Sequence, residues 1–178
     1  NHVHKIGNRM RALHQKGMPE GLSIVRNSRF NPVPEHVHDY VEISYVYCGN
    51  APQIVNGAQL TLAQNEVLLL DAACPHAIGE LGEHDIMLSI VISRPMLRRS
   101  LDQSLSSAGT VSRFLLNALN DETDHRGHVH FRTGGSRRVR RYMQEMLCEL
   151  LEPTAASPQI ASRLFELLLV ELMQSYEA

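Results

Sequence analysis

The stretch PEHVHDYVEISYVY occupies residues 34–47, and Gly49 follows it closely. Valine, isoleucine and tyrosine, which favour the pleated surface of a strand, are dense in this stretch. We therefore predict a strand over residues 37–47, ended by the turn-forming pair Gly49 and Asn50. The stretch also carries three polar side chains that can share one site, His36, His38 and Glu42.

Short strands separated by turns extend on both sides of this stretch. Asn56 and Gly57 predict a type I′ hairpin because both residues tolerate a positive φ, and Gly82 marks a further turn. The other predicted strands cover residues 22–30, 53–62, 66–70, 76–81 and 85–93. Six strands at this spacing, with no helix between them, predict an antiparallel sandwich or barrel.

The periodicity changes after Arg94 and Pro95. Predicted elements are short helices over 96–105 and 111–119, a strand over 128–132, and longer helices over 136–151 and 160–173. Pro153 ends the first long helix and Ser157 can cap the second. The expected fold class is mainly β, with an antiparallel barrel followed by two adjacent helices.

Composition excludes several broad classes of protein. A chain of 178 residues with 43% hydrophobic and 20% charged residues is typical of a globular protein, and a formal net charge of -2 argues against a chain built to coat nucleic-acid phosphates. Three widely spaced cysteines without a CxxC pair disfavour a disulfide framework and favour a reducing compartment. Because neither a signal peptide nor an apolar run of membrane length is present, we expect a cytoplasmic protein with no membrane partner.

The two ends of the sequence indicate part of a longer protein. The chain begins at Asn1 and ends at Ala178, directly after an apolar helical segment. We expect an N-terminal arm over residues 1–20, a barrel over 21–95 and a helical region over 96–178.

His36, His38, Glu42 and His76 are the candidate chemical site. Three imidazoles and one carboxylate suit a divalent transition metal such as zinc, nickel, iron or manganese. On one strand, positions 36, 38 and 42 would face the same side because side chains alternate. A straight strand would nevertheless separate the Cα atoms of His38 and Glu42 by about 13 Å. One ion could be held only if the chain bends near residues 39–40.

Three uses of this cluster remain open from the residues alone. The side chains can contact an organic ligand, hold a metal, or form a hydrogen-bonded group that only supports the barrel. We favour contact with an organic ligand, with a metal as the next alternative and no cofactor certain. Nucleophilic catalysis has little support, because the sequence lacks G-x-S-x-G and Cys74 has no identifiable orienting group.

The spacing of His36, His38, Glu42 and Gly49 resembles the first conserved motif of the cupin superfamily, H-x-H-x3-E-x6-G. In the second cupin motif only His76 matches. Cupins are small antiparallel barrels, so this resemblance implies a jelly-roll type of barrel. It also implies the alternative function, a cupin metalloenzyme such as a dioxygenase or isomerase with His36, His38, Glu42 and His76 as metal ligands.

A narrower resemblance covers residues 22–178. The stretch 34–43, the segment 66–76 and the closing apolar helix 164–173 are similar to the sensor domain of AraC-family transcription regulators. Such regulators have an effector-binding cupin barrel, a helical dimerisation element and a separate DNA-binding domain with two helix-turn-helix motifs. The resemblance implies a non-enzymatic sensor whose four polar side chains contact a small-molecule effector. DNA would be bound only through a domain absent from this sequence.

Two surface features follow from the C-terminal half. The segment 164–173 is apolar around most of its circumference, so we expect a homodimer through Leu164, Leu168 and Leu172, with burial inside one chain as the alternative. Six arginines and no acid lie within residues 126–141. A solvated face is the favoured interpretation of these arginines, and contact with phosphates or a partner is the other.

Overall fold

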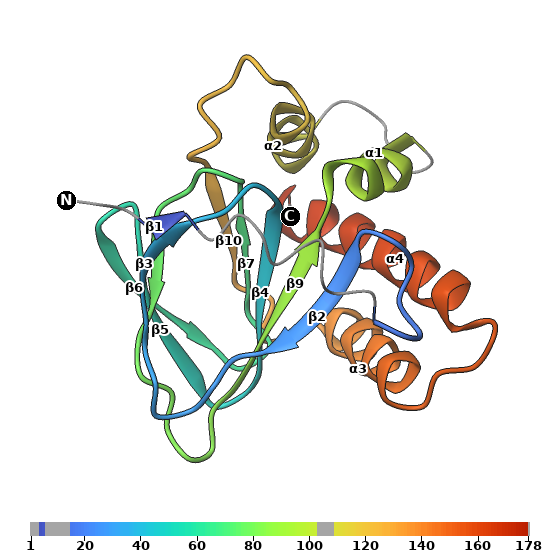
Figure 1. Ribbon diagram of the computed structural model, residues 1–178, viewed down its shortest axis with the longest axis horizontal. Helices are drawn as coiled ribbons and strands as arrows, with labels where there is room; N and C mark the ends of the chain where they lie inside the picture. The colour runs from blue at the N-terminus through green and yellow to red at the C-terminus, as the bar shows by residue number, and fades with distance from the viewer. Residues whose placement is uncertain (1–3, 6–14, 103–108, 178) are drawn as a thin grey trace.

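Two facing β-sheets and a layer of helices make up the computed structural model, which describes residues 4–5, 15–102 and 109–177 (Figure 1). Within these residues the chain forms ten strands, five in each sheet, and four helices. The helices are α1 (Arg94–Asp102), α2 (Thr110–Ala118), α3 (Arg137–Leu151) and α4 (Ser157–Glu177). Figure 1 shows α3 and α4 side by side against one of the two sheets.

Each sheet combines strands that are distant in the sequence. Sheet A has the order β1 (His4–Lys5), β3 (Val33–Val37), β8 (His76–Ile78), β5 (Asn50–Val55), β6 (Ala58–Ala63). Sheet B has the order β10 (His128–Phe131), β7 (Val67–Leu70), β4 (Val41–Cys48), β9 (Ile86–Ile92), β2 (Leu22–Arg26). All described pairings are antiparallel except that of β1 with β3. The expected mainly β, cupin-like fold with C-terminal helices is confirmed.

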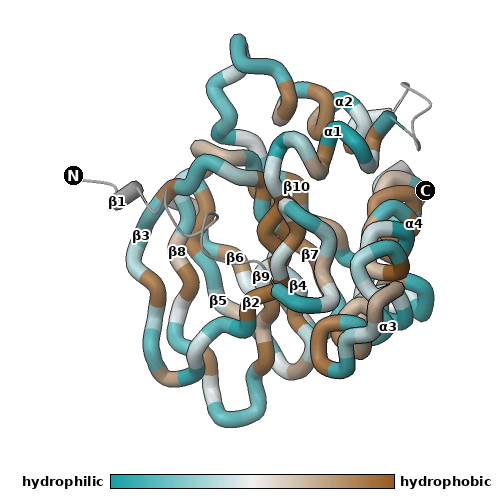
Figure 2. The backbone as a smooth tube through the Cα atoms, turned by 45° about the vertical axis from the view of Figure 1, so that its right-hand side comes forward, coloured by the Kyte–Doolittle hydropathy of each residue, from teal (hydrophilic) through white to brown (hydrophobic). Residues whose placement is uncertain are grey.

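Sheet B lies between two hydrophobic cores because the side chains of its strands alternate in direction. On β4, Ile43 and Tyr45 belong to the core shared with the helices, whereas Val46 belongs to the core between the sheets. Glu42 and Ser44 have the parity of Val46 and therefore face sheet A. Figure 2 shows the hydrophobic residues gathered in the centre of the molecule, where sheet B runs.

The first long helix forms where its sequence pattern predicts it. The side chain of Ser136 caps α3 by accepting a hydrogen bond from the backbone N–H of Val139. Val139, Met143 and Met146 lie on one face and are buried. This face packs on α4 and sheet B, so the helix is held by its apolar stripe.

The predicted single strand over residues 37–47 is wrong. β3 ends at Val37, the chain bends over residues 38–40, and β4 begins at Val41 in the other sheet. The backbone N–H of His38 donates to the carbonyl of Ala72, 3.2 Å away, and thus leaves the ladder of β3. The bend that a shared site requires is therefore present, although His36 and Glu42 stand on different strands.

Other boundaries differ by a few residues. The strand predicted over 22–30 ends at Arg26, and the chain turns at Phe30, which has a φ of 61°. The region predicted as one strand over 53–62 is a hairpin, with φ values of 50° at Asn56 and 78° at Gly57. The type I′ expectation for this turn is confirmed.

Part of the predicted arm (1–3 and 6–14) and the end of the helix predicted over 96–105 lie outside the described residues. The division at residues 20 and 95 stays a prediction. None of the described helices combines the length and the hydropathy needed to cross a membrane.

Candidate functional site

Strand pairing and the bend together assemble His36, His38, Glu42 and His76. His36 on β3 is the register partner of His76 on β8. The bend carries His38 across to sheet B, where Glu42 lies near the start of β4. The four side chains thus converge between the two sheets, although they come from three strands and a loop.

The distances within this group, hereafter the histidine cluster, are short. One nitrogen of each histidine lies within 4.8 Å of a nitrogen of the others. Nε2 of His38 is 3.1 Å from Oε2 of Glu42. The exposed fractions are 6% for His36, 2% for His38, 4% for Glu42 and 0% for His76. The expected co-location of all four residues is therefore met, by a bent chain rather than by strand parity.

Backbone carbonyls fix the tautomers of the three histidines. Nδ1 of His36, His38 and His76 lies 2.9, 2.9 and 3.1 Å from the carbonyl oxygens of residues 34, 40 and 74, respectively. A carbonyl oxygen only accepts, so each Nδ1 must carry the proton and donate it. In the neutral rings Nε2 is then a lone-pair acceptor. Nε2 of His38 instead faces a Glu42 carboxylate oxygen, which only accepts, so this nitrogen donates to Glu42. The acceptors of the cluster therefore include the Glu42 carboxylate and the Nε2 lone pair of His76.

Burial and charge set the protonation of the cluster. Burial opposes ionisation of Glu42, but hydrogen bonding and the charge of His38 outweigh it and lower the Glu42 pKa to about 2. Burial lowers the pKa of His76 to about 4, an effect that nearby Glu42 only partly offsets. Near neutral pH the cluster therefore contains a carboxylate anion and an uncharged His76.

Neighbouring polar groups extend the histidine cluster. The Ser44 hydroxyl donates to Oε1 of Glu42 at 3.3 Å, and a hydrogen bond from Ser89 also favours the ionised carboxylate. Among the described residues, Nε2 of His76 and Oε1 of Gln53 are buried without a hydrogen-bond partner. Sequence reasoning missed Ser44, Ser89 and Gln53. Of these three, only Ser44 could have been found from the sequence, because it follows Glu42 by two positions on one strand and therefore faces the same side.

Apolar side chains continue inward from the histidine cluster. The core between the sheets contains Val46, Leu62, Leu68, Leu81 and Met87. The interior of the two-sheet fold therefore has one polar end, rich in acceptors, and one apolar end.

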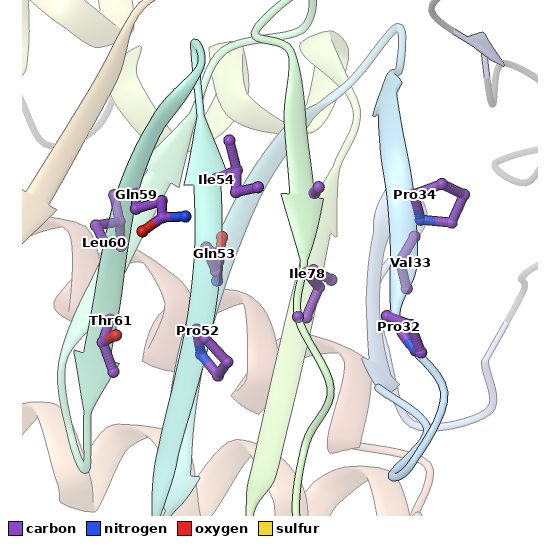
Figure 3. Close-up of a pocket in the computed structure, with 12 residues that line it drawn as sticks. Pro32, Val33, Pro34, Pro52, Gln53, Ile54, Gln59, Leu60, Thr61 and Ile78 are labelled. Atoms are coloured by element: carbon purple, nitrogen blue, oxygen red, sulfur yellow. The ribbon is translucent and has the colours of Figure 1, made fainter.

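A separate groove of about 460 Å³ lies on the outer face of sheet A (Figure 3). Pro52 and Ile54 point into it from β5, whereas Ala51 and Val55 of the same strand face the inter-sheet core. None of the four cluster residues lines this groove. The groove and the histidine cluster are thus on opposite faces of sheet A.

The residues expected at a dimer interface are divided between core and surface. Leu168 and Leu172 are 0% and 1% exposed and belong to the core of the single chain, which corrects the expectation that a partner covers them. Leu164 is partly buried. The exposed large apolar residues of α4 are instead Ile160, Leu167 and Tyr176, at 40%, 47% and 47%. An open groove of about 560 Å³ lies along Gln159, Ile160, Arg163, Leu164 and Leu167.

Two facing antiparallel sheets with helices packed on one of them define a cupin-like domain with a C-terminal helical layer. The sequence matches the family described as the AraC-like ligand binding domain over residues 25–174. The chain belongs to this family, and the resemblance found in its sequence is confirmed. No curated protein sequence matches the chain.

Solved structures of ToxT share the fold at low sequence identity. An apo form of ToxT from Vibrio cholerae is 13% identical, with a TM-score of 0.57 over 88% of this chain and 56% of that chain. ToxT from the same organism bound to an unsaturated fatty acid gives 0.53, with 13% identity over 88% of this chain and 54% of that one. A cupin superfamily protein from Desulfitobacterium hafniense is 22% identical, with a TM-score of 0.36 over 40% of this chain and 65% of that chain. The chain thus spans a little over half the length of the ToxT chains.

Proposed function

We propose that this chain is the effector-sensing part of an AraC-type transcription regulator and that the DNA-binding segments lie outside this sequence. The observation that carries the proposal is the buried histidine cluster in a chain of the AraC-like ligand-binding family. A transcription regulator must reach DNA, and we propose that this protein is cytoplasmic. The chain itself performs no catalysis in this proposal.

The chemistry of the histidine cluster indicates the class of effector. Within the described part of the chain, Nε2 of His76 and Oε1 of Gln53 are buried acceptors without a donor. Such acceptors are costly, so the occupant supplies hydrogen-bond donors such as hydroxyl or ammonium groups. The apolar end around Val46, Leu68 and Met87 suits a hydrocarbon portion of the same molecule. We therefore propose a small donor-bearing effector with one apolar end.

A thermal-shift screen with polyols, alkyl amines and alkyl alcohols tests this proposal. A ligand at about 100 times its Kd stabilises the folded state by about 2.7 kcal/mol, which gives a clear rise in Tm. Glu42→Gln and His76→Gln should weaken the shift while keeping the far-UV CD spectrum. His84→Asn, on an exposed loop, should leave it unchanged. If both site variants bind as the wild type does, or if both unfold, the cluster does not serve effector binding.

A second candidate function for the cluster is to hold a transition metal. His36, His38 and His76 can offer Nε2 while Nδ1 donates to a backbone carbonyl, which is how metal-binding histidines are commonly oriented. Glu42 would supply a fourth, anionic ligand. Zinc, nickel, iron or manganese suits this set, and such an ion would supply Lewis-acid or redox chemistry to a cupin metalloenzyme.

Elemental analysis of the purified chain separates the two candidates. The effector proposal expects a substoichiometric amount of metal that does not change when His38 is replaced by alanine. One equivalent of a tightly held metal, lost in His38→Ala, would favour the metal function. A turnover assay on the metal-loaded chain would then decide between a metalloenzyme and a metal-assisted sensor.

We also propose that the chain forms a homodimer, through the outer face of α4 rather than through Leu168 and Leu172. Effector uptake between the sheets would bias the helices packed on sheet B, and through them the DNA-binding segments of both subunits. The exposed Ile160 and Leu167 support this placement of the interface.

A further inference from the structure

A concentrated group of arginines lies at the start of α3. Four come from the first five residues of the helix, and the fifth comes from the segment that links β10 to α3. All five side chains are exposed: Arg132, Arg137, Arg138, Arg140 and Arg141. We call this group the arginine face.

The arginine face is poorly compensated by nearby acids. Among the described residues, its ion pair is the one from Arg138 to Glu171, 3.4 Å long, with the Arg138 side chain 70% exposed. The first turn of α3 contains no acidic residue. The N-terminal end of a helix already carries a partial positive charge, so arginines there add repulsion. A sequence selected for stability alone would place acids at this position.

We propose that the arginine face binds the phosphate backbone of a nucleic-acid duplex without reading its sequence. Every cation of the run from residue 126 to 141 is arginine and none is lysine. The planar guanidinium group matches phosphate oxygens with two parallel hydrogen bonds. Backbone N–H groups at the start of α3 add donors that favour the same anion.

The spacing of negative charges on a duplex matches the arginine face better than that on an acidic protein surface does. Duplex DNA carries one negative charge about every 1.7 Å of its axis, so several closely spaced arginines can each meet a phosphate. Arg137 to Arg141 spans one helical turn, about 6 Å along the axis. An acidic protein would have to supply several carboxylates within the same distance.

The proposal concerns a local surface and does not depend on the histidine cluster. The net charge of -2 keeps overall affinity low. The chain by itself should therefore show weak binding that ignores sequence, in support of stronger contacts made elsewhere in the full protein. Failure of effector binding would leave this surface unaffected, and the reverse also holds.

Fluorescence anisotropy with a short labelled DNA duplex of arbitrary sequence tests the proposal, from about 50 to about 200 mM salt. The test variant combines Arg137→Gln, Arg140→Gln and Arg141→Gln. The control combines Arg26→Gln, Arg98→Gln and Arg113→Gln, which removes the same charge from exposed positions elsewhere. Far-UV CD spectra of both variants check that each is folded.

The wild type should bind the duplex with a Kd of about 10⁻⁶ to 10⁻⁴ M near physiological salt, and more tightly at low salt. The test variant should lose about tenfold or more at low salt, and its logarithmic salt slope should shrink by about three. The control should stay close to the wild type. Equal losses in both variants would mean that bulk charge is responsible, and would overturn the proposal.

Two further outcomes would also overturn it. If the wild type does not bind the duplex at the lowest salt, the arginine face is only a solvated surface. Tighter binding of polyglutamate than of the duplex would assign the face to an acidic protein partner. If the triple variant loses its folded spectrum, Arg137→Gln and Arg141→Gln are measured singly, and each should reduce the salt slope by about one.

Discussion

His76 shows how the fold controls a single imidazole. Its side chain is fully buried, Nδ1 donates to the Cys74 carbonyl, and Nε2 has no hydrogen-bond partner among the residues that the structure describes. Burial holds its pKa at about 4, below the usual value of 6.5. The ring is therefore kept neutral at a pH where an exposed histidine is partly charged. This state leaves its Nε2 lone pair free for a donor or an ion.

The buried neutral His76 predicts a loss of stability in mild acid. Below pH 6.5 the unfolded chain binds a proton at His76, whereas the folded chain binds it only near pH 4. The free energy of unfolding therefore falls as pH falls. Between pH 6.5 and 4.5 the loss from this residue is on the order of 2–3 kcal/mol. Glu42 adds its own loss only below pH 4.5, as its folded pKa is about 2.

Urea denaturation followed by far-UV CD, in EDTA at several pH values, measures this effect. His76→Gln cannot titrate and should flatten the pH dependence by that amount. His84→Asn, at an exposed position, should retain the wild-type slope. A His76→Gln slope equal to that of the wild type would show that other groups cause the acid sensitivity.

For individual residues, the sequence identified the histidine cluster but not the polar groups around it. His36, His38, Glu42 and His76 stand out by residue type and spacing. Ser89 and Gln53 reach the same interior from β9 and β5, and their positions depend on strand pairings that a single sequence does not specify. The parity argument for His38 failed because this residue left the strand to bond with Ala72.

Among the structural elements, the segment after β7 connects the histidine cluster to the helical layer. The carbonyl of Ala72 holds His38, while the neighbouring Asp71 accepts from Nδ1 of His125 at 3.1 Å. Nε2 of His125 in turn accepts from Arg94, 3.0 Å away at the start of α1. His125 thus bridges a buried carboxylate beside the candidate site and the first helix.

Removal of this bridge should destabilise the protein. His125→Ala leaves the buried Asp71 carboxylate without its histidine, which should cost about 1–3 kcal/mol in urea denaturation. Hydrogen exchange at the His38 amide should also accelerate, because the Ala72 carbonyl is then less firmly held. Asp121→Asn is the matched control: it removes a carboxylate that pairs with Arg94 on the surface, 88% exposed, and should change stability little. A loss in His125→Ala no larger than in Asp121→Asn would contradict this role.

The elements themselves were largely predictable, since most strands and all four helices follow local patterns of alternation and periodicity. The division of the stretch 34–47 between two sheets was not, because it depends on β8 and β9 as distant partners. α4 begins at Ser157 and continues to Glu177, beyond the predicted 160–173. At its start Ser157 donates to Glu149 of α3, and near its end the Tyr176 ring contacts Phe131 of β10.

For the whole molecule, sheet B separates two cores, one facing sheet A and one facing the helices. The apolar stripe of α4 that includes Phe165, Leu168 and Leu172 completes the second core within one chain. Because apolar residues surround most of α4, the sequence predicted that more than one neighbouring element covers this helix. It did not predict which side of the helix faces the core. The remaining stripe, marked by Ile160 and Leu167, stays exposed in the single chain.

Adjacent leucines on α4 allow a sharp test of the proposed homodimer. Leu167 is 47% exposed, so Leu167→Asp combined with Ile160→Asp should give a folded monomer, whereas Leu168→Asp puts a charge in the core and should unfold the chain. A helix of 21 residues, about 31 Å long, is sufficient for an interface of the roughly 1,000 Å² that stable association requires. Full burial of each large apolar side chain contributes about 1.5–3 kcal/mol relative to its exposed state.

Sedimentation equilibrium at micromolar concentration should show a dimer for the wild type and for Leu116→Asp, a control on α2 with 40% exposure. The two-fold axis would bring the same α4 stripe of both subunits together, so each substitution removes two contacts per dimer. For that reason Leu167→Asp alone should already raise the dissociation constant by about 100-fold or more. A wild-type chain that stays monomeric at high concentration would show that the exposed apolar side chains of α4 are too few for self-association, and the homodimer would be abandoned.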